Sequence, residues 1–214
     1  MKPFKVDKMM MMKQLVLSIE TTVEGGSLSI LANREEIDGW SGSRKVSKAE
    51  EVLEQISNLL EKNNLKKNSI KAIAVSIGAG SLTGEKIGRA IAGGLAKSLN
   101  CPLIEVSVLE SLLLEFGNKL EGEYITAIPT GKNRVQWQNF TIKEDITYKS
   151  PSSVQISDRG EFIEKIKKAS SNYVMLAVNF RKFPEDFLKD AMPINFSKSS
   201  LAKLIGFSAC NNRV

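Results

Sequence analysis

Histidine is absent from all 214 residues of the chain. Its absence excludes a Ser–His catalytic triad, a histidine general base and any His-ligated metal in this chain. The two cysteines, Cys101 and Cys210, have no neighbour at the spacing of a metal or redox motif, which is typical of reducing compartments. No apolar run approaches the roughly 20 residues that a membrane-spanning helix needs. We therefore expect a cytoplasmic protein with no membrane contact, no metal and no cofactor of its own.

The central part of the sequence also lacks an excess of charge of either sign. The net charge is +6, but residues 1–13 contribute +3, residues 143–214 contribute +4, and residues 14–142 have a net charge of −1. Basic side chains such as Lys165, Lys167 and Lys168 fit a solvated helix face better than a nucleic-acid groove. Direct reading of a nucleic-acid sequence is therefore disfavoured, and weak backbone contact with an RNA held by a partner stays open.

The organising segment runs from Ile70 to Val106. Residues 70–77 are almost all apolar, which predicts an inner strand of an α/β sheet that is covered on both faces. A glycine-rich turn follows, then a helix over residues 84–99 and a second strand. This is the order of a strand–helix–strand unit in which the turn lies at the N-terminus of the helix.

The glycine-rich turn is a weak candidate for binding nucleotide phosphates, because backbone N–H groups at a helix N-terminus attract anions. Its spacing misses two common fingerprints: Thr83 stands where GxGxxG requires glycine, and Glu85 stands where a P-loop requires lysine. The alternative is that Ser81 or Thr83 simply caps the helix. The residues of the candidate nucleotide site are Gly78, Gly80, Ser81, Thr83 and Gly84.

The helix after the turn has two stripes at spacing four, one of large side chains and one of small ones. Each of Gly88, Gly93 and Gly94 costs a helix interior roughly 1 kcal/mol relative to alanine, so a close contact must offset it. The small stripe can admit either this chain's own sheet or a helix of a second protein. The large stripe is Ile87, Ile91, Leu95 and Leu99, and the small stripe is Gly84, Gly88, Ala92 and Ala96.

The flanking segments complete an α/β fold. Residues 15–19, 27–31 and 37–41 are predicted strands, and a helix with an inward-facing Leu53 is predicted from Ser47 to about Leu60. The order strand, strand, strand, helix, strand, helix, strand indicates the ribonuclease H-like half of the actin, sugar-kinase and Hsp70 superfamily, a mixed sheet flanked by helices. We expect a flexible extension over residues 1–12, this domain over 13–116, a smaller, degenerate α/β domain over 117–198, and a C-terminal helix in 199–214 that packs back on the first domain. Trp137 and Phe140 are predicted core residues of the smaller domain.

The segment SIGAGSLTGEKIGRAIAGGLAKSLNCPLIEVSVLESL resembles the signature of the bacterial TsaB family, also called YeaZ. VLSIETTVEGGSLSIL resembles the first hairpin of that family and SRKVSKAEEVLEQISNLL its first helix, so the likeness covers residues 15–114. The sequence departs from the family pattern at the turn, at Pro129–Gly131, where relatives have Asp-Ala-Arg, and at the C-terminal end. We interpret the chain as a divergent member.

The resemblance implies a non-catalytic adaptor in the synthesis of N6-threonylcarbamoyladenosine at position 37 of tRNA. The implied partners are a TsaD-like protein, which performs the transfer, and a TsaE-like ATPase, with tRNA contacted only through the complex and with room for ATP or ADP at the partner interface. The first two helices are implied to dock TsaD. The predicted interface residues are Lys48, Glu51, Gln55, Gly84, Gly88, Arg89 and Ala92.

Two other functions stay open. The chain is alternatively an ATP-dependent phosphotransferase of the same superfamily, or a homodimeric scaffold that has lost the tRNA role. The first is disfavoured by Glu20, which stands where superfamily ATPases use an aspartate. A glutamate is one methylene longer and displaces a metal-bound water from its working position. We expect Glu20 to be structural, bonded to the backbone at the hairpin turn.

Overall fold

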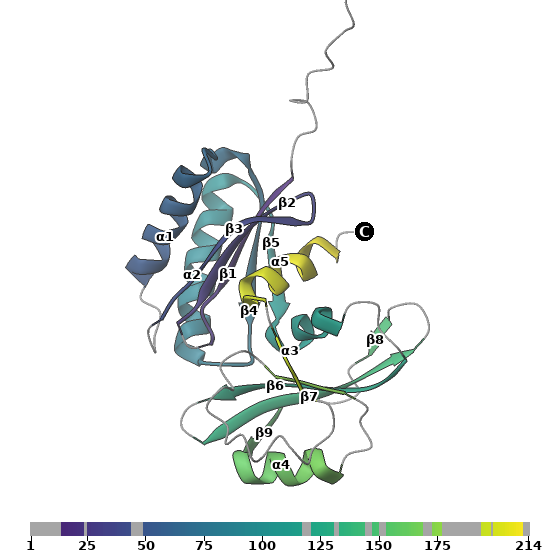
Figure 1. The fold of residues 1–214 in the computed structure, drawn as a ribbon. Coiled ribbons are helices and arrows are strands. Elements are labelled where there is room, and N and C mark those ends of the chain that lie inside the picture. Colours follow the sequence, from purple (N-terminus) through teal and green to yellow (C-terminus); the bar gives the residue numbers. More distant parts are fainter. Residues whose placement is uncertain are drawn as a thin grey trace, which may run out of the picture.

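The computed structural model describes residues 14–23, 25–43, 49–116, 121–130, 133–143, 147–149, 153–168, 173–176, 194–197 and 199–211. The described residues form two sheets with helices between and around them (Figure 1). The strands are β1 Leu15–Glu20, β2 Ser27–Ala32, β3 Glu35–Ser41, β4 Ile70–Ile77, β5 Leu103–Ser107, β6 Gly122–Thr130, β7 Arg134–Lys143, β8 Thr147–Lys149, β9 Gln155–Asp158, β10 Tyr173–Leu176 and β11 Ile194–Phe196. The helices are α1 Ala49–Lys62, η1 Lys67–Ser69, α2 Leu82–Leu99, α3 Val108–Ser111, η2 Leu112–Phe116, α4 Arg159–Lys168 and α5 Leu201–Asn211.

The first sheet has the strand order β3-β2-β1-β4-β5. β1 is antiparallel to β2 and parallel to β4, and β4 is parallel to β5. Because β1 and β4 lie inside the sheet, alternate side chains enter two different cores: Leu17 and Ile73 pack under α1 and α2, whereas Val16 and Ala74 pack under α5. Helices therefore cover both faces of this sheet.

The second sheet has the order β11-β10-β6-β7-β8, and β9 also pairs with β7. α4 packs on its outer face, where the rings of Trp137 and Phe162 lie 5.9 Å apart. The inner face contributes Tyr124 and Phe140 to the same core as α3 and α5. α3 and α5 thus lie between the two sheets, as Figure 1 shows. The prediction that Trp137 and Phe140 are core residues is confirmed, because each is 2% exposed.

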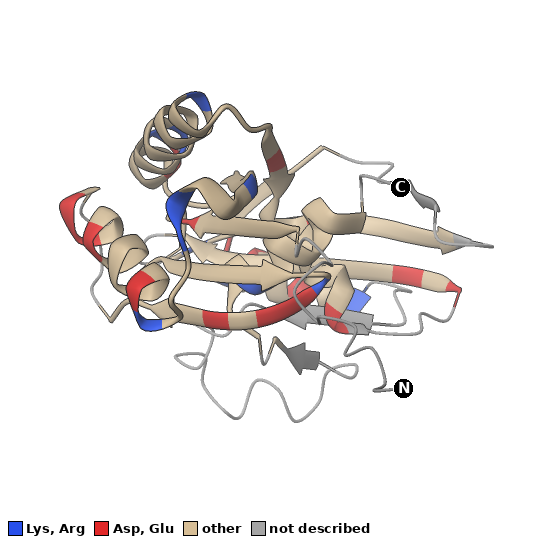
Figure 2. Ribbon diagram, turned by 90° about the horizontal axis from the view of Figure 1, so that it is seen from above, with Lys and Arg blue, Asp and Glu red and all other residues tan. Residues whose placement is uncertain are grey.

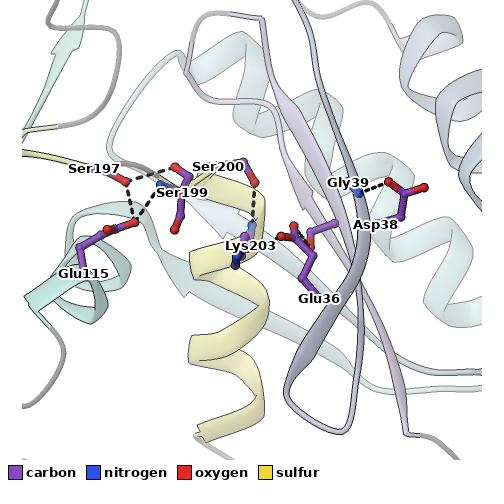
Figure 3. A network of polar contacts seen from close by, with 9 residues as sticks. Glu36, Asp38, Gly39, Glu115, Ser197, Ser199, Ser200 and Lys203 are labelled. Carbon is purple, nitrogen blue, oxygen red and sulfur yellow. Dashed lines mark hydrogen bonds and ion pairs between the residues drawn. The ribbon is translucent and has the colours of Figure 1, made fainter.

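Polar contacts hold α5 in the layer between the sheets (Figure 3). The carboxylate of Glu115 accepts hydrogen bonds from the Ser197 hydroxyl (3.0 Å) and the Ser199 amide (2.9 Å). Lys203 of α5 forms an ion pair with Glu36 of β3, with 3.1 Å between Nζ and Oε2. These contacts tie the chain that enters α5 to η2 on one side and to the edge of the first sheet on the other.

Several predicted elements differ in detail from the observed ones. β3 begins at Glu35, two residues earlier than predicted, and α2 begins at Leu82. Leu53 was expected to face inward but is 46% exposed, whereas Leu60, two turns further along the same side of α1, is 3% exposed. The predicted start of this helix at Ser47 lies outside the described residues, and the proposed domain boundaries stay a prediction.

Candidate functional site

The first part of the candidate site is the end of β1, where Glu20 is 1% exposed. Its Oε1 accepts hydrogen bonds from the Thr22 amide (2.5 Å), the Thr22 hydroxyl (2.8 Å) and the Val23 amide (2.9 Å). Burial raises the pKa of the Glu20 carboxyl, and these hydrogen bonds oppose that shift only in part. The geometry agrees with a structural glutamate that closes the hairpin turn, as the sequence predicts.

The second part is the glycine-rich turn, whose backbone donors are largely used within the chain. The Gly80 amide donates to Oε1 of Gln136 (2.7 Å), the Ser81 amide to the Thr22 carbonyl (2.7 Å), and the Gly84 amide to the Ser81 hydroxyl (3.2 Å). Ser81 is the N-cap of α2, which is the alternative that the sequence left open. Thr83 is exposed and Gly78 has a positive φ of 43°. The amides of Gly80, Ser81 and Gly84 are therefore not free for a phosphate, and nucleotide binding by this turn stays an untested prediction.

The small stripe of α2 packs on the chain's own hairpin. Gly84, Gly88 and Ala92 are all buried. A Cβ added at Gly88 would lie 2.4 Å from Oγ1 of Thr21, and a Cβ at Gly84 would meet the Thr21 carbonyl oxygen closer still. Thr21 in turn donates its hydroxyl to the Gly84 carbonyl at 2.7 Å. Gly84 and Gly88 therefore permit a close approach by Thr21 of the same chain, and Ala92 is buried with them. Whether a partner also contacts these three residues stays a prediction.

The other predicted interface residues lie outside the small stripe. Arg89 forms ion pairs with Glu85 (3.5 Å) and with Glu105 of β5 (2.9 Å), so it faces the β5 edge of the sheet. Glu51 and Gln55 are half-buried on α1, and Lys48 lies outside the described residues. Whether Arg89, Glu51 and Gln55 contact a partner stays a prediction.

The outermost rows of α1 and α2, the two helices that cover one face of the first sheet, were not predicted as a site from the sequence. Each row follows the spacing four, four, three, which brings its members to one face of a helix. At Gly93 and Gly94, an added Cβ would have no heavy atom within 4 Å. The exposed row of α1 is Glu50, Glu54, Asn58 and Glu61, and the exposed row of α2 is Lys86, Ala90, Gly94 and Lys97. We call these two rows the outer face.

A hollow of about 460 Å³ lies elsewhere, between β3 and the start of α5. Its charged side chains pair with neighbours: Glu36 with Lys203, and Asp38 with Lys62, whose Nζ lies 2.8 Å from Oδ2. The bond from Lys62, followed by that from Asn63, lowers the pKa of Asp38. These pairs hold α5 and α1 to the edge strand, and the hollow is lined by no residue of the glycine-rich turn.

Among the described residues, no three His, Cys, Asp or Glu side chains come together in a way that would hold a metal ion. No helix in the described ranges is both long and apolar enough to span a membrane. Acidic and basic positions are interspersed along the described chain (Figure 2).

Comparison with known proteins identifies the family. The family described as TsaD, tRNA N6-adenosine threonylcarbamoyltransferase, matches residues 45–197, which is more than half of the chain. A protein named tRNA threonylcarbamoyladenosine biosynthesis protein TsaB from Buchnera aphidicola subsp. Baizongia pistaciae is 25% identical over 203 residues, covering 94% of this chain and 91% of that protein. A TsaB from Buchnera aphidicola subsp. Acyrthosiphon pisum is 27% identical over 188 residues, covering 77% and 85%. The chain belongs to the family that this model describes and is a TsaB (YeaZ) member of it.

The structural comparison agrees with TsaB membership. A crystal structure of an uncharacterized Pseudomonas aeruginosa protein with similarity to peptidase YEAZ has a TM-score of 0.65 at 17% identity, covering 94% of this chain and 92% of that one. At this identity the likeness concerns the fold, and it confirms the predicted mixed sheet with flanking helices. As a TsaB family member, the protein takes part in threonylcarbamoyladenosine biosynthesis, within the tRNA modification system that contains TsaD.

Proposed function

We propose that this TsaB member is a non-catalytic adaptor subunit that docks a TsaD-like protein through the outer face of α1 and α2. A TsaE-like ATPase then joins the pair, and tRNA is contacted only through the assembled complex in the cytoplasm. The observation that carries the proposal is the contrast between two glycines of one helix. Thr21 of the same chain occupies the space next to Gly88, whereas the space next to Gly94 is open.

The open glycines need an explanation, because each costs α2 roughly 1 kcal/mol relative to alanine. The described part of the chain offers no close contact at Gly93 or Gly94 that would offset this cost. Helices approach each other most closely where such residues meet, so a partner helix lying over Gly94 supplies the missing contact.

Charge and shape favour a partner with the same fold. The exposed row of α1 carries Glu50, Glu54 and Glu61, and the row of α2 carries Lys86 and Lys97. If the partner has a related helix pair and the two pairs are related by a two-fold axis, the acidic row of α1 in one protein faces the basic row of α2 in the other. These opposite charges orient the two proteins as they meet and disfavour wrong partners. A stable contact of this kind buries about 800 Å² per partner.

The geometry of Glu20 supports the non-catalytic part of the proposal. The one carboxylate at the end of β1 is buried, and its Oε1 is held by three donors of its own hairpin. A group that works as a general base must reach the proton that it removes. Glu20 instead stabilises the turn that presents Thr21 to α2.

The test is co-purification with the TsaD-like protein of the same organism. Wild type should form a complex, and Gly94→Leu should abolish it while raising thermal stability, because leucine favours the helix and a Cβ at this position has no heavy atom of the described chain within 4 Å. Lys168→Leu is the matched control: it places a leucine on α4, where Lys168 is 79% exposed, and should bind normally. Normal binding by Gly94→Leu would refute the docking face, and a wild-type chain that forms only homodimers would refute the partner.

A further inference from the structure

Gln136 connects the second sheet to the glycine-rich turn of the first domain. It lies on β7 in register with Ile128 of β6, and Ile128 belongs to the core shared with α5. The side chain of Gln136 is half-buried, and its Oε1 accepts the hydrogen bond from the Gly80 amide at 2.7 Å. The loop between β4 and α2 lies above the second sheet in Figure 1, so this bond crosses between the two halves of the molecule.

Two consecutive amides of the turn are therefore bound to two different elements. Gly80 donates to Gln136 of the second sheet, and Ser81 donates to Thr22 of the first hairpin. Gly80 lies close against the hairpin, because a Cβ at this position would lie 2.5 Å from the Thr22 carbonyl oxygen. Its φ of 137° is one that other residues rarely adopt. The turn is thus held from both sides, immediately before α2 begins.

We infer that Gln136 is a latch residue that fixes the glycine-rich turn, and with it the first turn of α2, in the conformation that docks the partner. An N–H at a helix N-terminus favours an oxygen acceptor, and in many proteins a bound anion supplies that oxygen. Here the amide oxygen of Gln136 takes the hydrogen bond, so the turn is held by the chain's own side chain. Leu82, two residues after Gly80 and 65% exposed, is the first residue of the helix that this bond positions.

Gln136 acts through the turn and touches no reacting group, so it is a positioning residue. Losing the bond frees the Gly80 amide and lets the turn sample conformations in which the first turn of α2, and with it the outer face, is not held in place. One such bond typically changes a local equilibrium by about a factor of ten. The docking part of this inference rests on the proposed function, whereas the latch itself does not.

The experiment compares Gln136→Met, which keeps the length of the side chain but removes the acceptor, with Gln136→Glu, which keeps an acceptor oxygen. Gln155→Met is the matched control, because the amide nitrogen of Gln155, on a strand of the same sheet, donates to the carbonyl and the hydroxyl of nearby Ser153. Hydrogen exchange of the Gly80 amide should become about tenfold faster in Gln136→Met and stay close to wild type in the other two variants. The affinity for the TsaD-like protein should fall several-fold in Gln136→Met alone. The loss of one hydrogen bond should lower the melting temperature of this variant by only about 2–4 °C, so it remains folded in the binding assay.

Each outcome decides one part of the inference. Unchanged Gly80 exchange in Gln136→Met refutes the latch. Faster exchange with unchanged affinity refutes its role in docking. Recovery of both readouts in Gln136→Glu supports a role for the acceptor oxygen and not for side-chain volume. If the wild-type chain does not bind the TsaD-like protein, the proposed function fails, and the exchange measurement still decides whether the latch exists.

Discussion

Gly88 and Gly94 lie six residues apart on α2, and the structure predicts opposite effects when each is changed to alanine. Alanine is favoured over glycine in a helix interior by about 1 kcal/mol, so helix propensity alone would stabilise both variants equally. The surroundings decide the difference. Gly94 has open space around it, whereas a Cβ at Gly88 would lie 2.4 Å from Thr21 Oγ1 and 3.5 Å from Val75.

The cost at Gly88 follows from what Thr21 must give up. Thr21 is 4% exposed, and its hydroxyl donates to the Gly84 carbonyl at 2.7 Å. Overpacking a filled core costs about 1–3 kcal/mol. Disturbing the hydrogen bond adds about 1 kcal/mol. After the gain of about 1 kcal/mol in propensity, Gly88→Ala should be about 1–3 kcal/mol less stable than wild type, and Gly94→Ala about 1 kcal/mol more stable.

Urea unfolding of wild type, Gly88→Ala and Gly94→Ala measures both changes in the free energy of unfolding. Thermal unfolding is a second readout, because a change of about 1 kcal/mol should move the melting temperature by about 2–4 °C in a chain of this size. Thr21→Ala removes the clashing oxygen, so Gly88→Ala should cost much less in that background than in wild type. Such a double-mutant cycle isolates the contact. Equal stabilisation by Gly88→Ala and Gly94→Ala would refute the placement of the small stripe against the hairpin.

Three further predictions test the buried groups and the anchor of α5. Because burial raises the pKa of Glu20, the folded protein holds this proton more tightly than the unfolded chain, so the free energy of unfolding should fall as pH rises from the ordinary carboxyl pKa to the raised one. Glu20→Gln should remove this decline in urea titrations between pH 4 and pH 8, and an unchanged slope would contradict it. The Ser76 hydroxyl is buried and has no hydrogen-bond partner among the described residues, so Ser76→Ala should leave thermal stability unchanged or raise it; a loss above about 1 kcal/mol would show that the hydroxyl is bonded after all. Lys203→Met removes the half-buried ion pair with Glu36 and should lower stability by less than about 1 kcal/mol, with the loss shrinking at high salt; a salt-independent loss would assign it to packing instead.

The fold was predictable because its strands and helices have clear periodicity. The apolar run at residues 70–77 predicted an inner strand, and the structure places β4 between β1 and β5 in the first sheet. Residues 27–31 were predicted to form a strand, and they lie in β2. The sequence left open whether Ser81 caps the helix or the turn binds a phosphate. The cap could be proposed from the sequence because it needs only a hydroxyl residue directly before the helix. The exposure of Leu53 was not predictable from the helix period, because Leu60 lies about two turns away on the same side of α1 and is buried.

The site was less predictable, because its contacts join residues far apart in sequence. The small stripe fitted two neighbours equally well, and only the position of Thr21 shows that the sheet is the neighbour. The hydrogen bond between Gly80 and Gln136 joins residues 56 apart in the sequence, so no local sequence pattern predicts it. The exposed rows of α1 and α2 could have been found, since their polar residues repeat at the same spacing as the buried ones.

The most direct test of the adaptor account is the content of N6-threonylcarbamoyladenosine in tRNA, measured by mass spectrometry of nucleosides from a strain that lacks this gene. Expression of the wild-type chain should restore the modification, and Gly94→Leu should fail to restore it although the variant is folded and present at the same level. Full modification with Gly94→Leu, or none with the wild-type chain, would contradict the claim that this protein acts by docking through the outer face of α1 and α2.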